Sequence, residues 1–252
     1  MLVRTNAIVL RRMRYSDTSI IATLLTEERG VESILAKGAR SPKSRLAAML
    51  EPLEQIEVQY YVKPGRELQL LRTAERTLLR RSIQSSFEHT VAALRIAELV
   101  LRLELPGHSH AEVFELVEET LVALDMTQSA TTAFPIAFAL RYAAVHGFSL
   151  QFNALDTLPP GNQSQPFILR LDRGTFEPVS DEVAHRGSHS DEVSRVDVQL
   201  LDHRTIVALK TLGHAPLDHL GFEQFDSTVI ETCSRIVERY LEFHFERRLR
   251  RG

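Results

Sequence analysis

The 252-residue sequence has one cysteine, no tryptophan and no apolar run long enough to cross a membrane. The lone Cys233 excludes an internal disulfide and a cysteine-cluster metal site, and it favours a reducing compartment. The apolar runs are far shorter than the roughly 20 residues that span a bilayer. Residues 1–14 also lack the unbroken apolar block and the cleavage site of a signal peptide. We therefore expect a cytoplasmic protein without a membrane segment.

Motifs of catalysis are also absent. The sequence has no GxxxxGK[ST] phosphate loop, no GxGxxG after a strand, no GxSxG elbow and no HExxH pair. Two close histidine pairs, His108 with His110 and His185 with His189, have no cysteine partners, and we interpret them as solvated loop histidines. Cys233 lies in an amphipathic helical stretch and is expected in the core. The sequence therefore predicts a protein that is not an enzyme and that uses no metal or cofactor.

Charge is distributed unevenly along the chain. Residues 1–81 contain 15 Lys and Arg against 9 Asp and Glu, a net charge of +6. Residues 82–252 contain 15 against 24, a net charge of −9, which gives the overall −3. A basic first third joined to an acidic remainder suggests an anion-binding module at residues 1–81, followed by a part of the chain with a different function. Chance clustering on a solvated surface is the alternative.

The first 80 residues have the pattern of β-structure. In residues 55–62, Ile56, Val58, Tyr60 and Val62 alternate with more polar residues, which is typical of a half-buried strand. Residues 63–66 (KPGR) form a turn signal between this strand and the next. Further strands are expected at residues 7–10, 19–25, 30–37 and 67–72. Five short strands are too few for a two-sheet sandwich, and they predict a small closed barrel.

After Arg72 the apolar spacing changes to that of helices. We expect helices at about 86–104, 109–124, 129–146, 197–212 and 226–248. Ser109 precedes Glu112 by the spacing of a capping box. The third helix is apolar around nearly its whole circumference and should be the buried centre of a helical domain. The fold class is thus α+β, with domains at 1–80 and 81–252. The second domain contains an irregular insertion at about 148–190, with short β-like pieces at 167–171 and 175–179.

The strongest functional signal lies in residues 36–46 (AKGARSPKSRL). Four cations occur within nine residues, while Gly38 and Pro42 prevent a helix or a strand and the small residues allow a polyanion backbone to approach. Arg11, Arg12 and Arg14 add charge at the end of the first strand. Tyr61 points outward in the alternation and either stacks on a base or is a half-covered surface aromatic. The candidate nucleic-acid-binding residues are Arg11, Arg14, Lys37, Arg40, Lys43, Arg45, Tyr61 and Arg66.

Several segments of the first third resemble one known family. They are residues 7–10 (AIVL), 15–19 (YSDTS), 25–30 (LTEERG), 36–46 (AKGARSPKSRL) and 50–53 (LEPL). Together they closely resemble the N-terminus of the RecO family, bacterial recombination mediators of the RecF pathway. Weaker similarity continues through residues 140–148 and the closing stretch 240–248. The resemblance therefore covers nearly the whole chain, with its specific part in residues 1–75.

The resemblance implies an N-terminal OB-fold barrel followed by a mostly helical domain. It also implies a role in DNA repair and homologous recombination. Family members bind single- and double-stranded DNA, anneal complementary strands coated with single-strand-binding protein, and help load RecA together with RecR, without nucleotide. We accordingly expect a cytoplasmic, nucleoid-associated protein. Many members carry a four-cysteine zinc site after the glycine that Gly147 matches. All four cysteines are missing here, which indicates a zinc-free member.

In some relatives, the C-terminal tail of single-strand-binding protein docks on the helical domain. Such a site needs an apolar pocket beside a cation. Arg102 and Arg141 are the candidate cations, and the alternative is that each simply reaches from the helices to solvent. Two other functions stay open for the chain. One is an OB-fold adaptor that binds RNA or ribosomal components, and the other is a hydrolase or nuclease that uses carboxylates such as Asp17 and Glu27.

Overall fold

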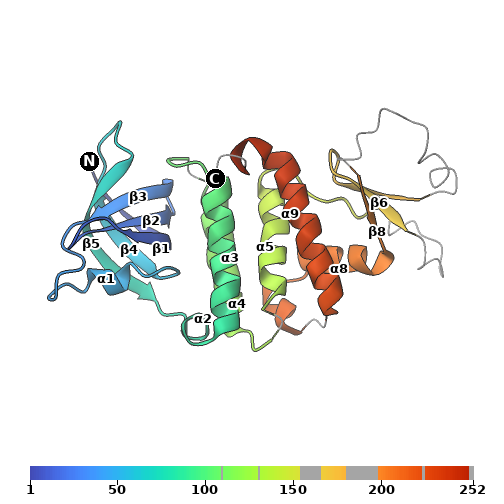
Figure 1. Cartoon of the computed structure of the whole chain (residues 1–252), viewed down its shortest axis with the longest axis horizontal. Helices are drawn as coiled ribbons and strands as arrows, with labels where there is room; N and C mark the ends of the chain where they lie inside the picture. The colour runs from blue at the N-terminus through green and yellow to red at the C-terminus, as the bar shows by residue number, and fades with distance from the viewer. Residues whose placement is uncertain (109, 130, 154–165, 180–197, 223–224, 250–252) are drawn as a thin grey trace. The chain divides into compact units, whose positions relative to one another are not determined.

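The computed structural model describes residues 1–108, 110–129, 131–153, 166–179, 198–222 and 225–249 (Figure 1). The chain forms two compact units, Met1–Thr131 and Thr132–Gly252. A closed barrel precedes the helices in chain order, so the predicted α+β class is confirmed. The domain boundary predicted after residue 80 stays a prediction. No helix in the described ranges is both long and apolar enough to span a membrane.

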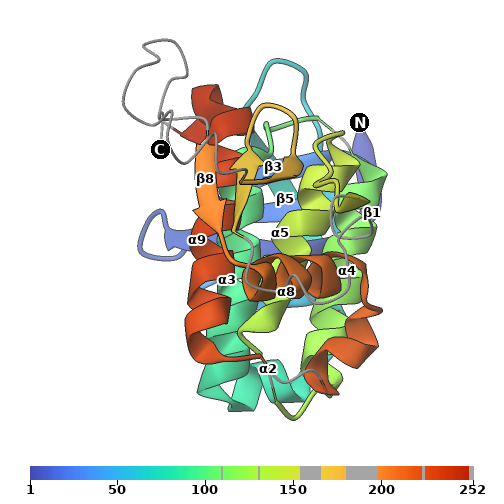
Figure 2. The same ribbon diagram turned by 90° about the vertical axis from the view of Figure 1, so that its right-hand side faces the viewer.

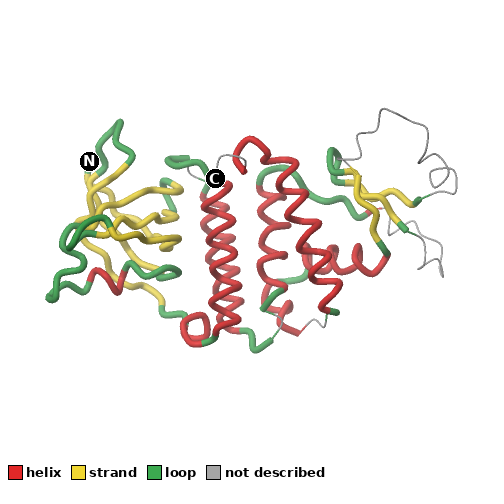
Figure 3. The backbone as a smooth tube through the Cα atoms, viewed as in Figure 1, coloured by secondary structure: helices red, strands yellow, loops and turns green. Residues whose placement is uncertain are grey.

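Five strands close into the N-terminal barrel in the order β1-β2-β3-β5-β4. The strands are drawn in yellow in Figure 3. Their bounds are β1 Leu2–Arg14, β2 Ile20–Thr26, β3 Gly30–Ala36, β4 Gln55–Tyr61 and β5 Leu68–Leu78. Neighbouring strands pair antiparallel except β3 and β5, which pair in parallel through residues 33–35 and 68–70. All five predicted strands are present. β1 and β5 are much longer than their apolar cores suggested, since their polar outer residues continue the pairing.

The barrel interior follows the alternation seen in β4. Ile56, Val58 and Tyr60 are fully buried, whereas Tyr61 between them and the turn is exposed. A short helix, α1 (Leu46–Met49), packs partly buried residues against the same core. The interior cluster comprises Val3, Ala7, Val9, Ile20, Ala22, Leu24, Ile34, Ala36, Ala39, Leu50, Ile56, Val58, Tyr60 and Val62.

Three helices complete the first unit: α2 (Arg81–Ser85), α3 (Phe87–Leu103) and α4 (Ala111–Met126). α3 begins as predicted, because the Ser86 side chain accepts a hydrogen bond from the His89 amide. α4 begins after His110, and the predicted capping residue Ser109 lies outside the described residues. α3 packs against β1. The outer-face residues Ile8 and Leu25, which pair with each other, are fully buried.

A buried polar network joins the barrel to these helices. Arg80 is 3% exposed and donates to the Leu53 carbonyl and to the side-chain oxygen of Gln55. Gln55 in turn donates to Glu118 on α4. Burial lowers the pKa of the Arg80 guanidinium, while the Glu118, Asp125 and Glu54 carboxylates oppose that shift. Gln55, expected on the polar outer side of β4, is therefore buried, because this network covers the start of the strand.

The second unit is built around α5 (Ala133–Val145). Nine of its thirteen residues are buried, as its apolar circumference predicts. α8 (His203–His214) and α9 (Ser227–Leu249) pack against it, and α8 lies across it (Figure 2). The short 3-10 helix η1 (Leu217–Phe222) also contacts α5. Cys233 on α9 is fully buried, and burial raises the pKa of its thiol to about 12, which is consistent with a core residue.

A small sheet with the order β7-β6-β8 completes the second unit. β6 (Phe167–Arg170) and β7 (Thr175–Pro178) match the two predicted β-like pieces. The helix predicted from about residue 197 is wrong in its first turn, because β8 (Val198–Leu201) occupies that place and pairs with β6. α8 starts only at His203, where the Asp202 side chain accepts from the Thr205 amide at 2.9 Å. The other parts of the predicted insertion, 154–165 and 180–190, lie outside the described residues.

Candidate nucleic-acid interface

The basic loop, residues 37–45, connects β3 to α1. Its four cations Lys37, Arg40, Lys43 and Arg45 are all exposed. Ala39, by contrast, is fully buried in the barrel core and anchors the loop. Successive turns shape the chain, since the Ser41 amide donates to the Gly38 carbonyl at 3.0 Å and the Ser44 amide donates to the Ser41 carbonyl at 2.9 Å. The loop therefore presents closely spaced positive charges from a fixed base.

Arg40 also connects this loop to the turn between β1 and β2. Its amide donates to the Thr18 carbonyl at 2.9 Å, and its Nη1 donates to the Ser16 carbonyl at 3.1 Å. Both acceptors belong to the turn between β1 and β2. The guanidinium therefore joins two loops although the Arg40 side chain is exposed.

The three arginines near the end of β1, Arg11, Arg12 and Arg14, do not lie on one face. Arg11 pairs with Thr23 and Arg14 pairs with Ile20, whose side chain is in the core, so the two predicted contacts lie on opposite faces of the strand. Both are exposed. Arg12 instead binds Glu51 at 2.6 Å and the Ala47 carbonyl at 3.1 Å. Arg12 thus holds α1 against the barrel.

Tyr61 is the last residue of β4, and Arg66 lies in the turn between β4 and β5. Tyr61 is 47% exposed, as the alternation predicts, and Arg66 is exposed within the turn. Gln69 braces this turn, because its side chain accepts from the Lys63 amide at 2.9 Å and donates to the Arg66 carbonyl at 2.7 Å. These two bonds stabilise the turn that follows Tyr61.

Strand pairing links apolar residues in a row that winds around the outside of the closed barrel. Tyr61 pairs with Leu70, Leu70 with Leu35, Leu35 with Ile21, and Ile21 with Met13. Tyr61, Leu70 and Met13 are 47%, 37% and 54% exposed, and the two central members are partly exposed. Sequence reasoning found only Tyr61, because the row depends on the parallel β3–β5 pairing, which periodicity does not reveal. We call these five residues the outer row.

Comparison with known proteins identifies the family to which this barrel and its helices belong. The family model described as recombination protein O N terminal matches residues 1–78. The model described as recombination protein O C terminal matches residues 84–251. The chain belongs to the RecO family. The predicted family and barrel-plus-helices fold are confirmed, and with its single cysteine this RecO-family chain lacks the four-cysteine zinc site.

Curated relatives with similar sequences carry the name DNA repair protein RecO. The one from Salinibacter ruber is 37% identical over 128 residues, which cover 51% of this chain and only 49% of that relative. The one from Chloroherpeton thalassium is 27% identical over 252 residues, or 98% of this chain and 94% of the relative. The one from Pelodictyon phaeoclathratiforme is 30% identical over 246 residues with the same two shares. This chain is accordingly a RecO-family DNA repair protein.

The two candidate partner-binding arginines of this RecO-family chain differ in their surroundings. Arg102 is exposed in the last turn of α3, in the first unit. Arg141 on α5, in the second unit, donates from Nη1 to the carbonyls of Ala137 at 3.1 Å and Leu212 at 2.7 Å, and from Nη2 to the carbonyl of Ala215. Arg141 therefore closes the C-terminal end of α8 and does not simply reach to solvent. Partner binding by either residue stays a prediction.

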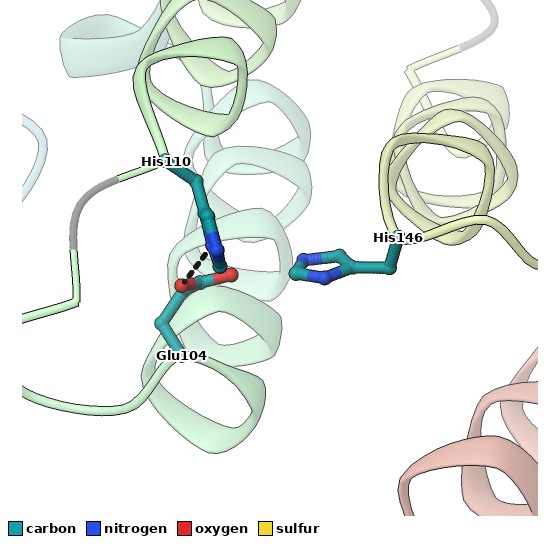
Figure 4. A group of neighbouring side chains, drawn as sticks. All are labelled: Glu104, His110 and His146. Atoms are coloured by element: carbon teal, nitrogen blue, oxygen red, sulfur yellow. Dashed lines mark hydrogen bonds and ion pairs between the residues drawn. The ribbon is translucent and has the colours of Figure 1, made fainter.

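The structure also shows where most of the histidines and carboxylates named in the sequence analysis lie. His110, at the start of α4, hydrogen-bonds through Nδ1 to the buried carboxylate of Glu104 at 3.2 Å (Figure 4). His108 is exposed, and His185 and His189 lie outside the described residues. Asp17 precedes β2 and Glu27 follows it, so the length of the strand, roughly 20 Å or more, separates these carboxylates. They do not form one acidic site.

Proposed function

We propose that this chain is a non-enzymatic recombination mediator. In this proposal it binds single- and double-stranded DNA, anneals complementary strands coated with single-strand-binding protein, and helps load RecA together with RecR. The observation that carries the proposal is an exposed cluster of cations on a fixed loop of the barrel in a chain of the RecO family. The DNA-repair names of the relatives support the choice of DNA as the ligand.

The physical basis of annealing is charge neutralisation. Two complementary strands repel each other through their phosphates, and cations placed along the backbone remove that repulsion while releasing counterions. The bases stay free to pair, so the step needs no acid, base, nucleophile or nucleotide. Lys37, Lys43 and Arg45 supply this charge in the proposal, with Arg11 and Arg66 on other parts of the barrel.

The test is annealing of complementary oligonucleotides coated with single-strand-binding protein, in the absence of nucleotide. We expect the wild-type chain to accelerate pairing and the Lys43→Glu, Arg45→Glu double variant to lose most of that acceleration. The double variant should also show a salt dependence of binding that is shallower by about 1 to 2 in the log–log slope, since two phosphate contacts are lost.

A matched control separates local charge from net charge. Arg81→Glu with Arg95→Glu changes the net charge equally, at exposed positions on α2 and α3. This control should anneal nearly as fast as the wild type. Equal losses in both double variants would show that only overall charge matters, and unchanged annealing in the loop variant would overturn the role of the loop.

The partner contacts are tested separately. We expect RecR to co-purify with the chain and the two proteins together to speed the exchange of single-strand-binding protein for RecA on DNA. A labelled peptide with the tail sequence of single-strand-binding protein should bind the chain, and Arg102→Ala should weaken that binding if Arg102 holds the terminal carboxylate. An RNA adaptor role is not favoured, and weaker binding to single-stranded RNA than to DNA of equal length would count against it directly.

A further inference from the structure

Helix α3 is apolar on two sides. Its buried side comprises His89, Ala92, Ala93, Ile96, Ala97, Val100 and Leu103. The opposite side contains four apolar residues that are exposed or partly exposed, namely Phe87, Val91, Leu94 and Leu101. Phe87 is 78% exposed and Leu94 is 40% exposed. With 3.6 residues per turn, the four side chains lie within about 80° of one another around the helix axis. We call these four residues the α3 stripe.

The α3 stripe has the spacing of a coiled-coil seam. Its members follow one another at intervals of four, three and seven residues, and Glu98 divides the last interval into four and three. Alternation of four and three is the heptad pattern. At 1.5 Å per residue, the seam from Phe87 to Leu101 is about 21 Å long. Side chains in such a seam pack between those of another helix, so the spacing indicates a helical partner.

The charged residues beside the stripe are complementary to their own reversed order. Glu88, Arg95 and Arg102 each follow a stripe residue directly, so they flank one side of it, and Glu98 lies in the seam. All four are exposed. Along α3 the charges are negative, positive, negative and positive, and in the reverse direction the signs are exchanged. A second copy of α3 that runs antiparallel therefore places opposite charges together, whereas a parallel copy places like charges together.

We infer that the α3 stripe is a self-association surface on which a second copy of this chain binds antiparallel across a two-fold axis. A two-fold axis brings the same patch of both copies together, which this charge order permits. In the pairing, Leu94 packs against the stem of Glu98 of the second copy, whose carboxylate meets Arg95. Glu88 and Arg102 pair at each end of the contact.

This inference goes beyond the proposed function and does not depend on it, since the pairing needs no DNA. α3 packs against β1 within the first unit. A dimer formed through α3 therefore carries two copies of the barrel and two copies of its basic loop.

Sedimentation equilibrium of the wild-type chain without DNA is the first test. One helix per copy is a small interface, so we expect a dissociation constant on the order of 10 µM. The mass should rise from that of a monomer near about 1 µM towards that of a dimer near about 100 µM. A monomer throughout this range would overturn the inference.

Exchange of the central charges tests the pairing itself. Arg95→Glu brings four carboxylates together at the centre of the dimer, and Glu98→Arg brings four guanidinium groups together. Each variant alone should associate at least about tenfold more weakly than the wild type. An equimolar mixture of the two should form a heterodimer about as tight as the wild-type dimer, because opposite charges then meet again.

The control for this exchange is Glu115→Arg. Glu115 is exposed on α4, and its substitution changes the net charge as much as Glu98→Arg does. The control should dimerise like the wild type. Arg95 and Glu98 are both exposed, so their variants should keep the circular dichroism and melting temperature of the wild type. Recovery in the mixture would also show that both variants are folded.

The apolar part of the contact is tested with Leu94→Ser. Leu94 is present twice in the dimer, so the substitution should weaken association about tenfold. A dimer as tight as that of the wild type would show that the stripe is not in the contact.

Cross-linking tests the antiparallel orientation. Cys233, the single cysteine of the chain, is fully buried, so an introduced surface cysteine is the reactive thiol. If Leu94 lies opposite Glu98 of the second copy, the two copies of residue 94 are about 6 Å apart along the helix axis and those of residue 87 are about 27 Å apart. A short thiol-reactive cross-linker should therefore link Leu94→Cys and leave Phe87→Cys unlinked. Equal linkage of both variants would indicate parallel helices and overturn the pairing.

The remaining outcomes separate this inference from the proposed function. A dimer retained by both Arg95→Glu and Glu98→Arg would place the contact elsewhere on the chain and overturn the role of α3. A mixture that stays monomeric would overturn the charge pairing. Failure of the wild type to bind DNA, with the dimer and its response to charge exchange as expected, would overturn the proposed function and support the α3 stripe as the self-association surface.

Discussion

The hydroxyl of Tyr240 lies directly against Gly174. It donates to the Phe148 carbonyl at 3.1 Å, and this position leaves no room for a β-carbon on the glycine. A Cβ at Gly174 would lie 2.6 Å from the Tyr240 oxygen and 2.9 Å from the Ser149 carbonyl oxygen. The contact packs the turn between β6 and β7 against α9. This packing requires a residue without a side chain at position 174.

Gly174→Ala should therefore destabilise the protein by about 3 kcal/mol or more, since the strain of a left-handed residue adds to a steric clash. Gly147→Ala is the matched control. Gly147 also has a positive φ, 84°, but nothing lies within 4 Å of its added carbon, so only about 1 kcal/mol of strain is expected. Urea unfolding measures both. Similar losses in the two variants would contradict the close contact with Tyr240.

Leu53 combines burial with strain. Leu53 is 8% exposed, yet its backbone has a φ of 70°. Its amide donates a hydrogen bond to the Val9 carbonyl at 2.7 Å, which helps to hold this conformation. Leu53→Ala and Leu53→Gly should both destabilise the barrel through lost burial. The glycine variant should nevertheless be the more stable of the two, by up to about 1 kcal/mol, because relief of left-handed strain outweighs the extra freedom of the unfolded chain. The reverse order in chemical denaturation would show that Leu53 is not strained.

Arg141 should matter for stability more than Arg102. Arg141→Met removes bonds to three carbonyls and is expected to cost about 2 kcal/mol in the free energy of unfolding. Arg102→Ala, at an exposed helix end, should cost less than about 1 kcal/mol. Thermal melts of both variants measure the difference. If Arg141→Met melts like the wild type, its guanidinium is available for a partner.

Arg40 and Lys43 should have separable effects. Arg40→Gln loses the bond to the Ser16 carbonyl and should lower stability slightly, by less than about 1 kcal/mol. Lys43→Gln should leave stability unchanged and reduce the salt slope of DNA binding by about 0.7 to 0.9, the share of one phosphate contact. Melting curves and salt titrations on each variant check both. A change in melting temperature with Lys43→Gln would show that the Lys43 side chain stabilises the folded loop, contrary to this prediction.

His244 gives the second unit a pH dependence. Its ring stacks on Phe148 at 4.3 Å and bonds through Nε2 to the Leu171 carbonyl at 2.9 Å. Burial lowers the pKa of His244, so the unfolded chain binds a proton at a higher pH than the folded chain does. Stability should therefore fall as the pH drops below about 6.5.

The matched variant for this prediction is His244→Phe, which keeps the stacked ring. The difference in unfolding free energy between wild type and variant should change with pH below about 6.5 and stay constant above it. A constant difference throughout the acid range would show that His244 does not titrate between the two states.

The sequence predicted those parts of the fold that depend on local pattern. The alternation around Tyr60 fixed the faces of β4, and the apolar circumference of residues 133–145 placed α5 in the core. Pairing between distant strands was not predictable, because Leu35 and Leu70 have no local feature that makes them neighbours. β8 was missed for a similar reason, since Val198 and Leu201 fit a helix until β6 supplies hydrogen bonds.

The candidate site was predictable to a similar extent. The composition of residues 37–45 predicted an exposed cationic loop, and all four cations are exposed. The sequence could not show that Arg40 bonds to the neighbouring turn, that pairing with β2 extends β1 as far as Arg14, or that Arg141 closes a helix. Each of these depends on a carbonyl or a strand partner far away in the chain.

Arg80 lies in the short stretch that neither family model matches, where a comparison of sequences would suggest a linker. The Arg80 guanidinium is nonetheless buried, and it donates to the Leu53 carbonyl and to the Gln55 side chain in the barrel. The Glu118 carboxylate on α4 offsets its charge. Cutting the chain there would leave a desolvated cation without its counter-charge and would uncover Ile8 and Leu25 to water. The gene could be divided at that point, but the resulting fragments should aggregate or unfold, so the smallest autonomous piece that carries the barrel extends through α4.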